Sequence, residues 1–133
     1  MMLDAGRIPI ITLHDFLLVP IQTALSDRLV SQLKDDITAA IVRVAARGLI
    51  VDVSGIDVMD SYISRSLRDI GMVARLMGVR TVIAGINPMI AMTLVEMDIS
   101  LGGVDTALNL ESALEQFANI VRVLPETEIW REE

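Results

Sequence analysis

A serine preceded by closely spaced aspartates is the most chemically suggestive part of the chain. Residues 50–61 read Ile-Val-Asp-Val-Ser-Gly-Ile-Asp-Val-Met-Asp-Ser, a buried strand followed by an acidic turn that ends at Ser61. The apolar residues after Ser61 recur at helical spacing, so we expect its hydroxyl at a helix start. A serine there caps the helix or, once phosphorylated, presents a strongly anionic group where backbone N–H donors converge. Arg65, one helical turn later, could face such a phosphate.

The aspartates of the same stretch raise a second possibility, a magnesium site formed by Asp52, Asp57 and Asp60. Each also has a structural use, because Asp57 lies in a turn and Asp60 precedes a helix, where negative charge is favoured. Lys34 is the only lysine, so no late lysine supports phosphoryl transfer. We expect no enzyme, no metal and no cofactor, with a magnesium-dependent phosphotransfer enzyme kept as the alternative.

Composition excludes other kinds of chemistry. The chain has no cysteine and a single histidine, His14, which we expect in a turn rather than in a Ser-His-Asp triad. A net charge of -7 with 3% aromatic residues argues against nucleic-acid binding. The richest apolar stretch, residues 79–99, is interrupted by glycine, proline and acidic residues, so we expect no membrane segment and a cytoplasmic protein.

The elements that position Ser61 follow from hydrophobic periodicity. Strands are predicted at residues 8–13 and 16–21, as a hairpin, and at 49–53 and 81–84. Helices are predicted from residue 27 to a cap at Gly48, from 61 to Gly78, from 88 to about 97 behind the cap Asn87, and after Asn109. This order indicates an α/β domain over residues 1–124, with a mostly parallel sheet and an N-terminal antiparallel hairpin. Residues 125–133, with Trp130, form a peripheral acidic tail.

Side chains are assigned to the core by the same spacing. The second helix should turn Ile63, Leu67, Ile70, Ala74 and Met77 inward, and the last helix Leu110, Leu114, Phe117 and Val121. The eight methionines, among them Met72, Met77, Met89, Met92 and Met97, should mostly fill the core. The high apolar content also predicts self-association.

Residues 49–63, Leu-Ile-Val-Asp-Val-Ser-Gly-Ile-Asp-Val-Met-Asp-Ser-Tyr-Ile, resemble the STAS family, the domain shared by sulfate transporters and anti-sigma-factor antagonists. The likeness extends to Leu-Met-Gly-Val at residues 76–79 and Gly-Ile-Asn-Pro at 85–88. It implies a mixed sheet of four or five strands, with about four helices packed chiefly on one face. Ordinary antagonists follow Asp-Ser with Ser or Thr and then Gly, whereas Tyr62 and Ile63 stand here. That departure resembles the RsbS-type branch, single-domain scaffolds of the stressosome.

The resemblance implies a role for each residue around Ser61. In that branch the matching serine is phosphorylated by an RsbT-type switch kinase of the GHKL class, which the scaffold sequesters together with an RsbR-type STAS paralogue. A PP2C-type phosphatase completes the circuit. Asp57, Asp60, Tyr62 and Arg65 would form the phosphosite environment and kinase-docking surface, and Thr93 matches a second phosphosite of the paralogues.

Phosphorylation would have a direct electrostatic effect on such a surface. It would add about -1.5 to -2 charges beside Asp57 and Asp60, and a bound kinase would be repelled without refolding of the domain. The sequence leaves open a free anti-sigma-factor antagonist that binds an anti-sigma kinase directly.

Overall fold

The computed structural model of the chain describes residues 7–22 and 24–123, with side chains as far as Phe117 in the last helix. Within this part, an opening hairpin is followed by alternating helices and strands, which confirms the α/β class. The predicted tail, residues 125–133 with Trp130, lies outside the described residues. In chain order the elements are β1 (Ile11–Leu13), β2 (Phe16–Pro20), α1 (Asp27–Val44), β3 (Gly48–Asp52), α2 (Ser61–Leu76), β4 (Arg80–Ala84), α3 (Pro88–Glu96), β5 (Asp105–Ala107) and α4 (Leu110–Val123).

The strands form one sheet in the order β1-β2-β3-β4-β5. The predicted hairpin is confirmed: β1 and β2 pair antiparallel across a turn in which His14 takes a positive φ of 58°. The other neighbours pair parallel, with Leu18 opposite Ile50 and Ile50 opposite Val82. Parallel pairing brings the carboxyl ends of β2, β3 and β4 to one edge of the sheet, and the loop to Ser61 starts from that edge.

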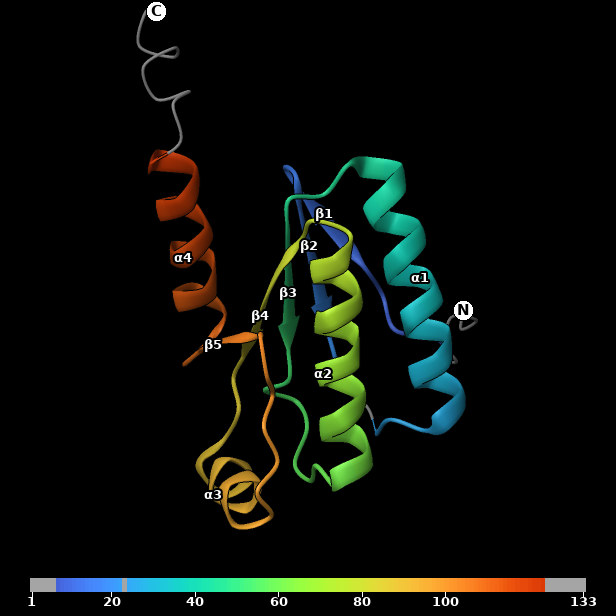
Figure 1. Ribbon diagram of the computed structural model, residues 1–133, viewed down its shortest axis with the longest axis vertical. Helices are drawn as coiled ribbons and strands as arrows, with labels where there is room; N and C mark the ends of the chain where they lie inside the picture. Colours follow the sequence, from blue (N-terminus) through green and yellow to red (C-terminus); the bar gives the residue numbers. More distant parts are fainter. Residues whose placement is uncertain (1–6, 23, 124–133) are drawn as a thin grey trace, which may run out of the picture.

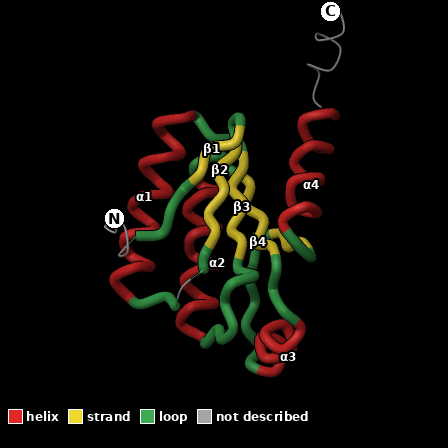
Figure 2. The backbone as a smooth tube through the Cα atoms, turned by 180° about the vertical axis from the view of Figure 1, so that it is seen from behind, coloured by secondary structure: helices red, strands yellow, loops and turns green. Residues whose placement is uncertain are grey.

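Helices cover both faces of the sheet (Figures 1 and 2). The two longest helices, α1 and α2, lie side by side on one face, as expected, and α4 packs on the other. Leu49 and Val51 of β3 belong to the larger core under α1 and α2, whereas Ile50 between them belongs to the core under α4. Because successive strand residues point to opposite faces, this division follows directly from the sequence. The short helix α3 lies beyond the carboxyl ends of the strands (Figure 1).

The predicted end of the first helix was wrong. The helix ends at Val44, and Ala45 takes the left-handed cap conformation with φ 53°. Gly48 is instead the first residue of β3, where an added Cβ would lie 2.8 Å from the ring of Phe117. Glycine is therefore required at this position by close packing against α4, and not by the turn.

The last strand and the methionines also differ from the predictions. The edge strand β5 was not predicted as an element, because three residues of mixed polarity carry no strand period. Asn109 caps α4 as expected, and Phe117 is buried, whereas the side chain of Val121 lies outside the described part. The prediction that the named methionines fill the core was wrong. They are 37–78% exposed: Met72, Met77, Met89, Met92 and Met97.

Candidate functional site

The loop between β3 and α2 carries the predicted site, and its backbone is fixed to the sheet at both ends. The N–H of Val53 donates to the carbonyl of Ala84 at 2.9 Å, and the N–H of Ile56 closes a turn onto the carbonyl of Val53 at 2.9 Å. Ile56 and Met59 are buried in the core under α1 and α2. These hydrogen bonds and buried side chains fix the backbone that carries Asp57, Asp60 and Ser61.

Two glycines allow neighbouring loops to approach this segment closely. A Cβ on Gly55 would lie 2.9 Å from the carbonyl oxygen of Ile21, and one on Gly85 would lie 2.9 Å from the Cβ of Ser54. Gly85 also has a positive φ of 85°. The loop is thus held between the segments that follow β2 and β4.

Asp60, and not Ser61, caps α2. Its backbone is extended (φ -86°, ψ -178°), and its Oδ1 accepts a hydrogen bond from the N–H of Ile63 at 2.8 Å. The carbonyl of Asp60 accepts from both the N–H and the hydroxyl of the buried Ser64, at 3.0 and 2.9 Å. Of the two uses considered for Ser61, capping is therefore taken over by its neighbour.

Ser61 is the first residue of the helix, and its hydroxyl is unused. Within residues 7–22 and 24–123 its side chain makes no hydrogen bond, and the backbone N–H groups of Ser61 and Tyr62 have no acceptor. The residue is half-buried. Unpaired N–H donors in the first turn, together with the positive end of the helix dipole, form a favourable environment for an anion attached to this hydroxyl.

The surroundings of Ser61 combine acidic and apolar exposed groups. Asp57 and Asp60 are exposed, Val58 is 80% exposed and Tyr62 is 43% exposed. A shallow hollow of about 610 Å³ lies beside them, between this loop and the segment that follows β2, and Asp57, Val58 and Asp60 line it. The sequence analysis did not identify Val58 as part of this surface. The available signal was its position, an apolar residue between the turn residue Asp57 and a buried methionine.

Arg65 lies on the exposed side of α2, four residues after Ser61. Its guanidinium makes no ion pair or hydrogen bond within the part of the chain that the structure describes. Residues four apart on a helix are neighbours, so this cation is available to a group on Ser61.

The aspartates considered for magnesium are not brought together as a metal-binding group. Among the described residues, no three His, Cys, Asp or Glu side chains form a cluster that could hold a metal ion. The Oδ1 of Asp52 instead accepts a hydrogen bond from the N–H of Ser54 at 3.0 Å, the local turn use of an aspartate.

Thr93, the second predicted phosphosite, lies on α3 and is half-buried. Its hydroxyl donates to the carbonyl of Met89 at 2.9 Å, the back-bonding of a threonine inside a helix. Unlike that of Ser61, this hydroxyl is already engaged. Across the described residues, no helix is long and apolar enough to cross a bilayer.

Comparisons with known proteins agree on one family. The model of the STAS domain family matches residues 7–116. Among curated proteins, the RsbT co-antagonist protein RsbRA of Bacillus subtilis is 23% identical over 113 residues, which are 85% of this chain but only 40% of RsbRA. The chain therefore spans less than half the length of that relative.

Solved structures extend the likeness over nearly the whole domain. A serine-to-glutamate variant of RsbS from Moorella thermoacetica is 37% identical with a TM-score of 0.76, over 87% of this chain and 98% of RsbS. A chain from a structure that describes the molecular architecture of the stressosome is 39% identical, with a TM-score of 0.76. The match covers 86% of this chain and all of the stressosome chain. The unphosphorylated anti-sigma factor antagonist SpoIIAA, at 16% identity and a TM-score of 0.68, shares the fold.

Proposed function

The chain belongs to the STAS domain family, and from that premise we propose that it is a non-catalytic scaffold of a stressosome-type assembly that sequesters a switch kinase and releases it when Ser61 is phosphorylated. Identity of 37–39% with RsbS and with a stressosome chain, over nearly all of each, supports the scaffold role over other STAS functions.

The observation that carries the proposal is the state of Ser61. Within the described residues its hydroxyl has no hydrogen-bond partner at the first residue of α2, because Asp60 has taken the capping position. A kinase substrate needs an accessible hydroxyl that can be modified without breaking the fold. Here the modification adds an anion beside unpaired N–H donors, so the helix tolerates or gains from it.

The electrostatics of the surrounding surface explain release. Before modification, Val58 and Tyr62 expose apolar surface on the same segment as the exposed Asp57 and Asp60. A phosphate on Ser61 adds about -1.5 to -2 charges at this place. Arg65 and the first turn of α2 hold that phosphate in position, and the partner surface meets a strongly anionic group where it previously met a neutral hydroxyl.

The proposed partners follow from the family. RsbRA and RsbRC of Bacillus subtilis are named as co-antagonists of RsbT, so we propose an RsbR-type STAS paralogue as the co-scaffold and an RsbT-type GHKL kinase as the sequestered enzyme. A PP2C-type phosphatase would restore the hydroxyl. Thr93 is a secondary phosphosite candidate, disfavoured by its bond to Met89.

Self-association is supported by the outer side of α3. Met89, Met92 and Val95 are 64–79% exposed and stand three residues apart, so they form one apolar ridge on the helix. We propose this α3 ridge as a contact with a second STAS domain, because exposed apolar surface of this kind marks interaction sites.

Phosphorylation is tested with the switch kinase and ATP, followed by mass spectrometry of the intact domain and its peptides. We expect one phosphate, on Ser61. Ser61→Ala should block phosphorylation and retain the kinase, while Ser61→Asp should lose it. Ser54→Ala, an exposed serine of the same loop, is the matched control and should behave as wild type. Phosphate elsewhere with Ser61 unmodified would refute the proposal.

Assembly is tested by light scattering with an RsbR-type paralogue. A particle of megadalton scale is expected, and Met89→Glu with Met92→Glu should prevent it, whereas Met72→Glu on α2 should not. A stable dimer or monomer that binds an anti-sigma kinase directly would favour the alternative, a free anti-sigma-factor antagonist.

A further inference from the structure

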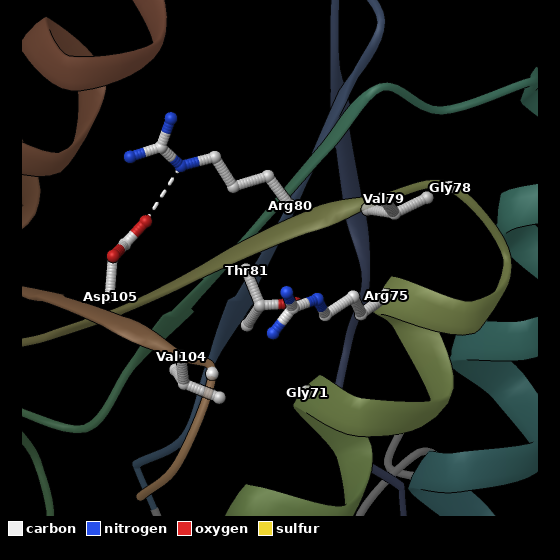
Figure 3. A pocket seen from close by; sticks show the side chains of 9 residues that line it. Gly71, Arg75, Gly78, Val79, Arg80, Thr81, Val104 and Asp105 are labelled. Atoms are coloured by element: carbon white, nitrogen blue, oxygen red, sulfur yellow. Dashed lines mark hydrogen bonds and ion pairs between the residues drawn. The ribbon is translucent and has the colours of Figure 1, made fainter.

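We propose that a cavity at the carboxyl end of α2, far from Ser61, binds a small molecule through a phosphate or carboxylate group. The cavity is about 600 Å³ and lies between the last turns of α2, the start of β4 and the segment before β5 (Figure 3). Its volume is in the range of small-molecule sites. The inference does not depend on the phosphorylation of Ser61.

A buried hydroxyl on the wall of this cavity lacks a partner. Thr81 is 4% exposed, and its Oγ1 makes no hydrogen bond, one of two such buried side-chain atoms in the described part of the chain. Burying an unsatisfied hydroxyl destabilises the folded state, so such groups in native proteins call for an explanation. The Oγ1 atom exposes less than 1 Å² to solvent, so a ligand oxygen supplies the missing partner only where the side chains that cover this hydroxyl shift on binding.

Two arginines line the same cavity. The guanidinium of Arg75 lies against the backbone of Gly103, where an added Cβ would be 2.7 Å from its Nη1. Within residues 7–22 and 24–123, Arg75 makes no ion pair. Arg80 donates from Nε to Asp105 at 2.6 Å, which leaves its two terminal nitrogens without a protein partner in the described part.

The charge balance of the cavity favours an anion. Asp105 is the one acidic residue among the described residues that line the cavity. Arg80 compensates its charge, so Arg75 contributes the excess positive charge. This local excess stands out in a chain of net charge -7. A planar guanidinium presents paired N–H donors that match the oxygens of phosphate and carboxylate groups.

Two glycines shape the wall of the cavity, Gly71 by allowing close packing and Gly78 by leaving open space. A Cβ on Gly71 would lie 2.3 Å from Cγ2 of Val104, so only glycine allows α2 this close to the segment before β5. Gly78, with φ +84°, has nothing within 4 Å of its Cβ position and leaves the cavity open to solvent at that side. Among the described residues that line the cavity none is aromatic, so recognition rests on the anionic group and not on ring stacking.

The site is independent of the phosphorylation site. Ser61 and Arg75 are fourteen residues apart on one helix, a separation of about 21 Å along its axis. An anion in the cavity therefore leaves the loop before Ser61 uncovered.

The test is an NMR titration of the unphosphorylated full chain with inorganic phosphate and, separately, with succinate. We expect saturable amide shifts at Gly71, Thr81 and Gly103. Arg75→Gln should weaken binding by roughly tenfold or more, because it removes a charged hydrogen-bond donor. Arg28→Gln removes an exposed arginine of α1 that makes no ion pair in the described part of the chain, and it should change nothing.

The two anions separate the possible sources. Binding of phosphate alone assigns a phosphate ester, and binding of succinate alone assigns a carboxylic acid. Shifts that do not saturate with either anion, or equal affinity in Arg75→Gln and wild type, would overturn the proposal. Neither result would bear on Ser61, because no kinase is present.

Discussion

The two ends of α2 present opposite solutions to holding an anion. At the first turn, Asp60 accepts from one backbone donor, and the N–H groups of Ser61 and Tyr62 have no acceptor among the described residues. At the last turn the helix dipole is negative, so an anion there must be held by side chains, and Arg75 and Arg80 provide them. The comparison teaches that a helix start offers backbone N–H donors to an anion, whereas a helix end offers none and needs guanidinium groups.

The largest expected effect is a reciprocal loss of binding at the two ends. Ser61→Asp should weaken kinase binding by about 3 kcal/mol, roughly a hundredfold in Kd, because it places like charge beside Asp57 and Asp60 in the docking surface. Arg75→Gln should leave kinase binding unchanged. Phosphate binding at the cavity should show the reverse: Arg75→Gln should weaken it, and Ser61→Asp should leave it unchanged. Calorimetry of each variant with kinase and with phosphate measures both, and an effect of either variant at the other end would break the independence of the two ends.

The next effect concerns the close packing of Gly71 against Val104 at the wall of the cavity. Gly71→Val should destabilise the domain by about 2 kcal/mol, because its side chain must displace Val104 in a packed region. Urea unfolding measures this change. Met72→Val, an exposed neighbour on the same helix, is the control and should stay within about 0.5 kcal/mol.

Gly71→Val should also abolish phosphate binding in the folded fraction, while Ser61 remains a kinase substrate. Retained stability together with retained anion binding would mean that the segment before β5 moves away freely, and the description of the cavity would then be wrong.

The sequence predicted both ends of α2, which starts at Ser61 and whose C-cap Met77 is followed by Gly78 with a positive φ of 84°, but it did not predict the end of α1. The start at Ser61 and the Asn87-Pro88 start of α3 depend on local signals, and both helices begin where those signals stand. The cap at Gly48 was wrong because that glycine serves contact with Phe117, a residue far along the chain.

The cavity depends on the same kind of long-range contact. Arg75, Thr81 and Gly103 meet only after α2, β4 and the segment before β5 have packed, and nothing in the local pattern of any of them indicates a site. The prediction that the methionines of α3 are buried was wrong for a related reason. Periodicity does not say whether a short helix is covered on its outer side.

A smaller effect on unfolding free energy distinguishes the capping bond of Asp60 from the negative charge at the start of α2. Asp60→Ala should cost about 1 kcal/mol of unfolding free energy, because the N–H of Ile63 loses its acceptor. Asp57→Ala removes an exposed carboxylate of the same loop and should cost less than about 0.5 kcal/mol. Urea unfolding of both variants distinguishes them. Equal losses would mean that charge, and not the capping bond, stabilises this end.

The smallest effect should have the opposite sign and occurs at the other end. Thr81→Val replaces an unpaired buried hydroxyl by a methyl group of the same shape, so it should stabilise the ligand-free domain by up to about 1 kcal/mol. The same variant should bind phosphate more weakly than wild type. Urea unfolding with and without phosphate measures both changes. A loss of stability in the absence of ligand would mean that the hydroxyl has a partner within the protein, and Thr81 would then be a structural residue of β4. A gain in stability with weaker phosphate binding would mean that this end of α2 retains an unfavourable group for the sake of a ligand.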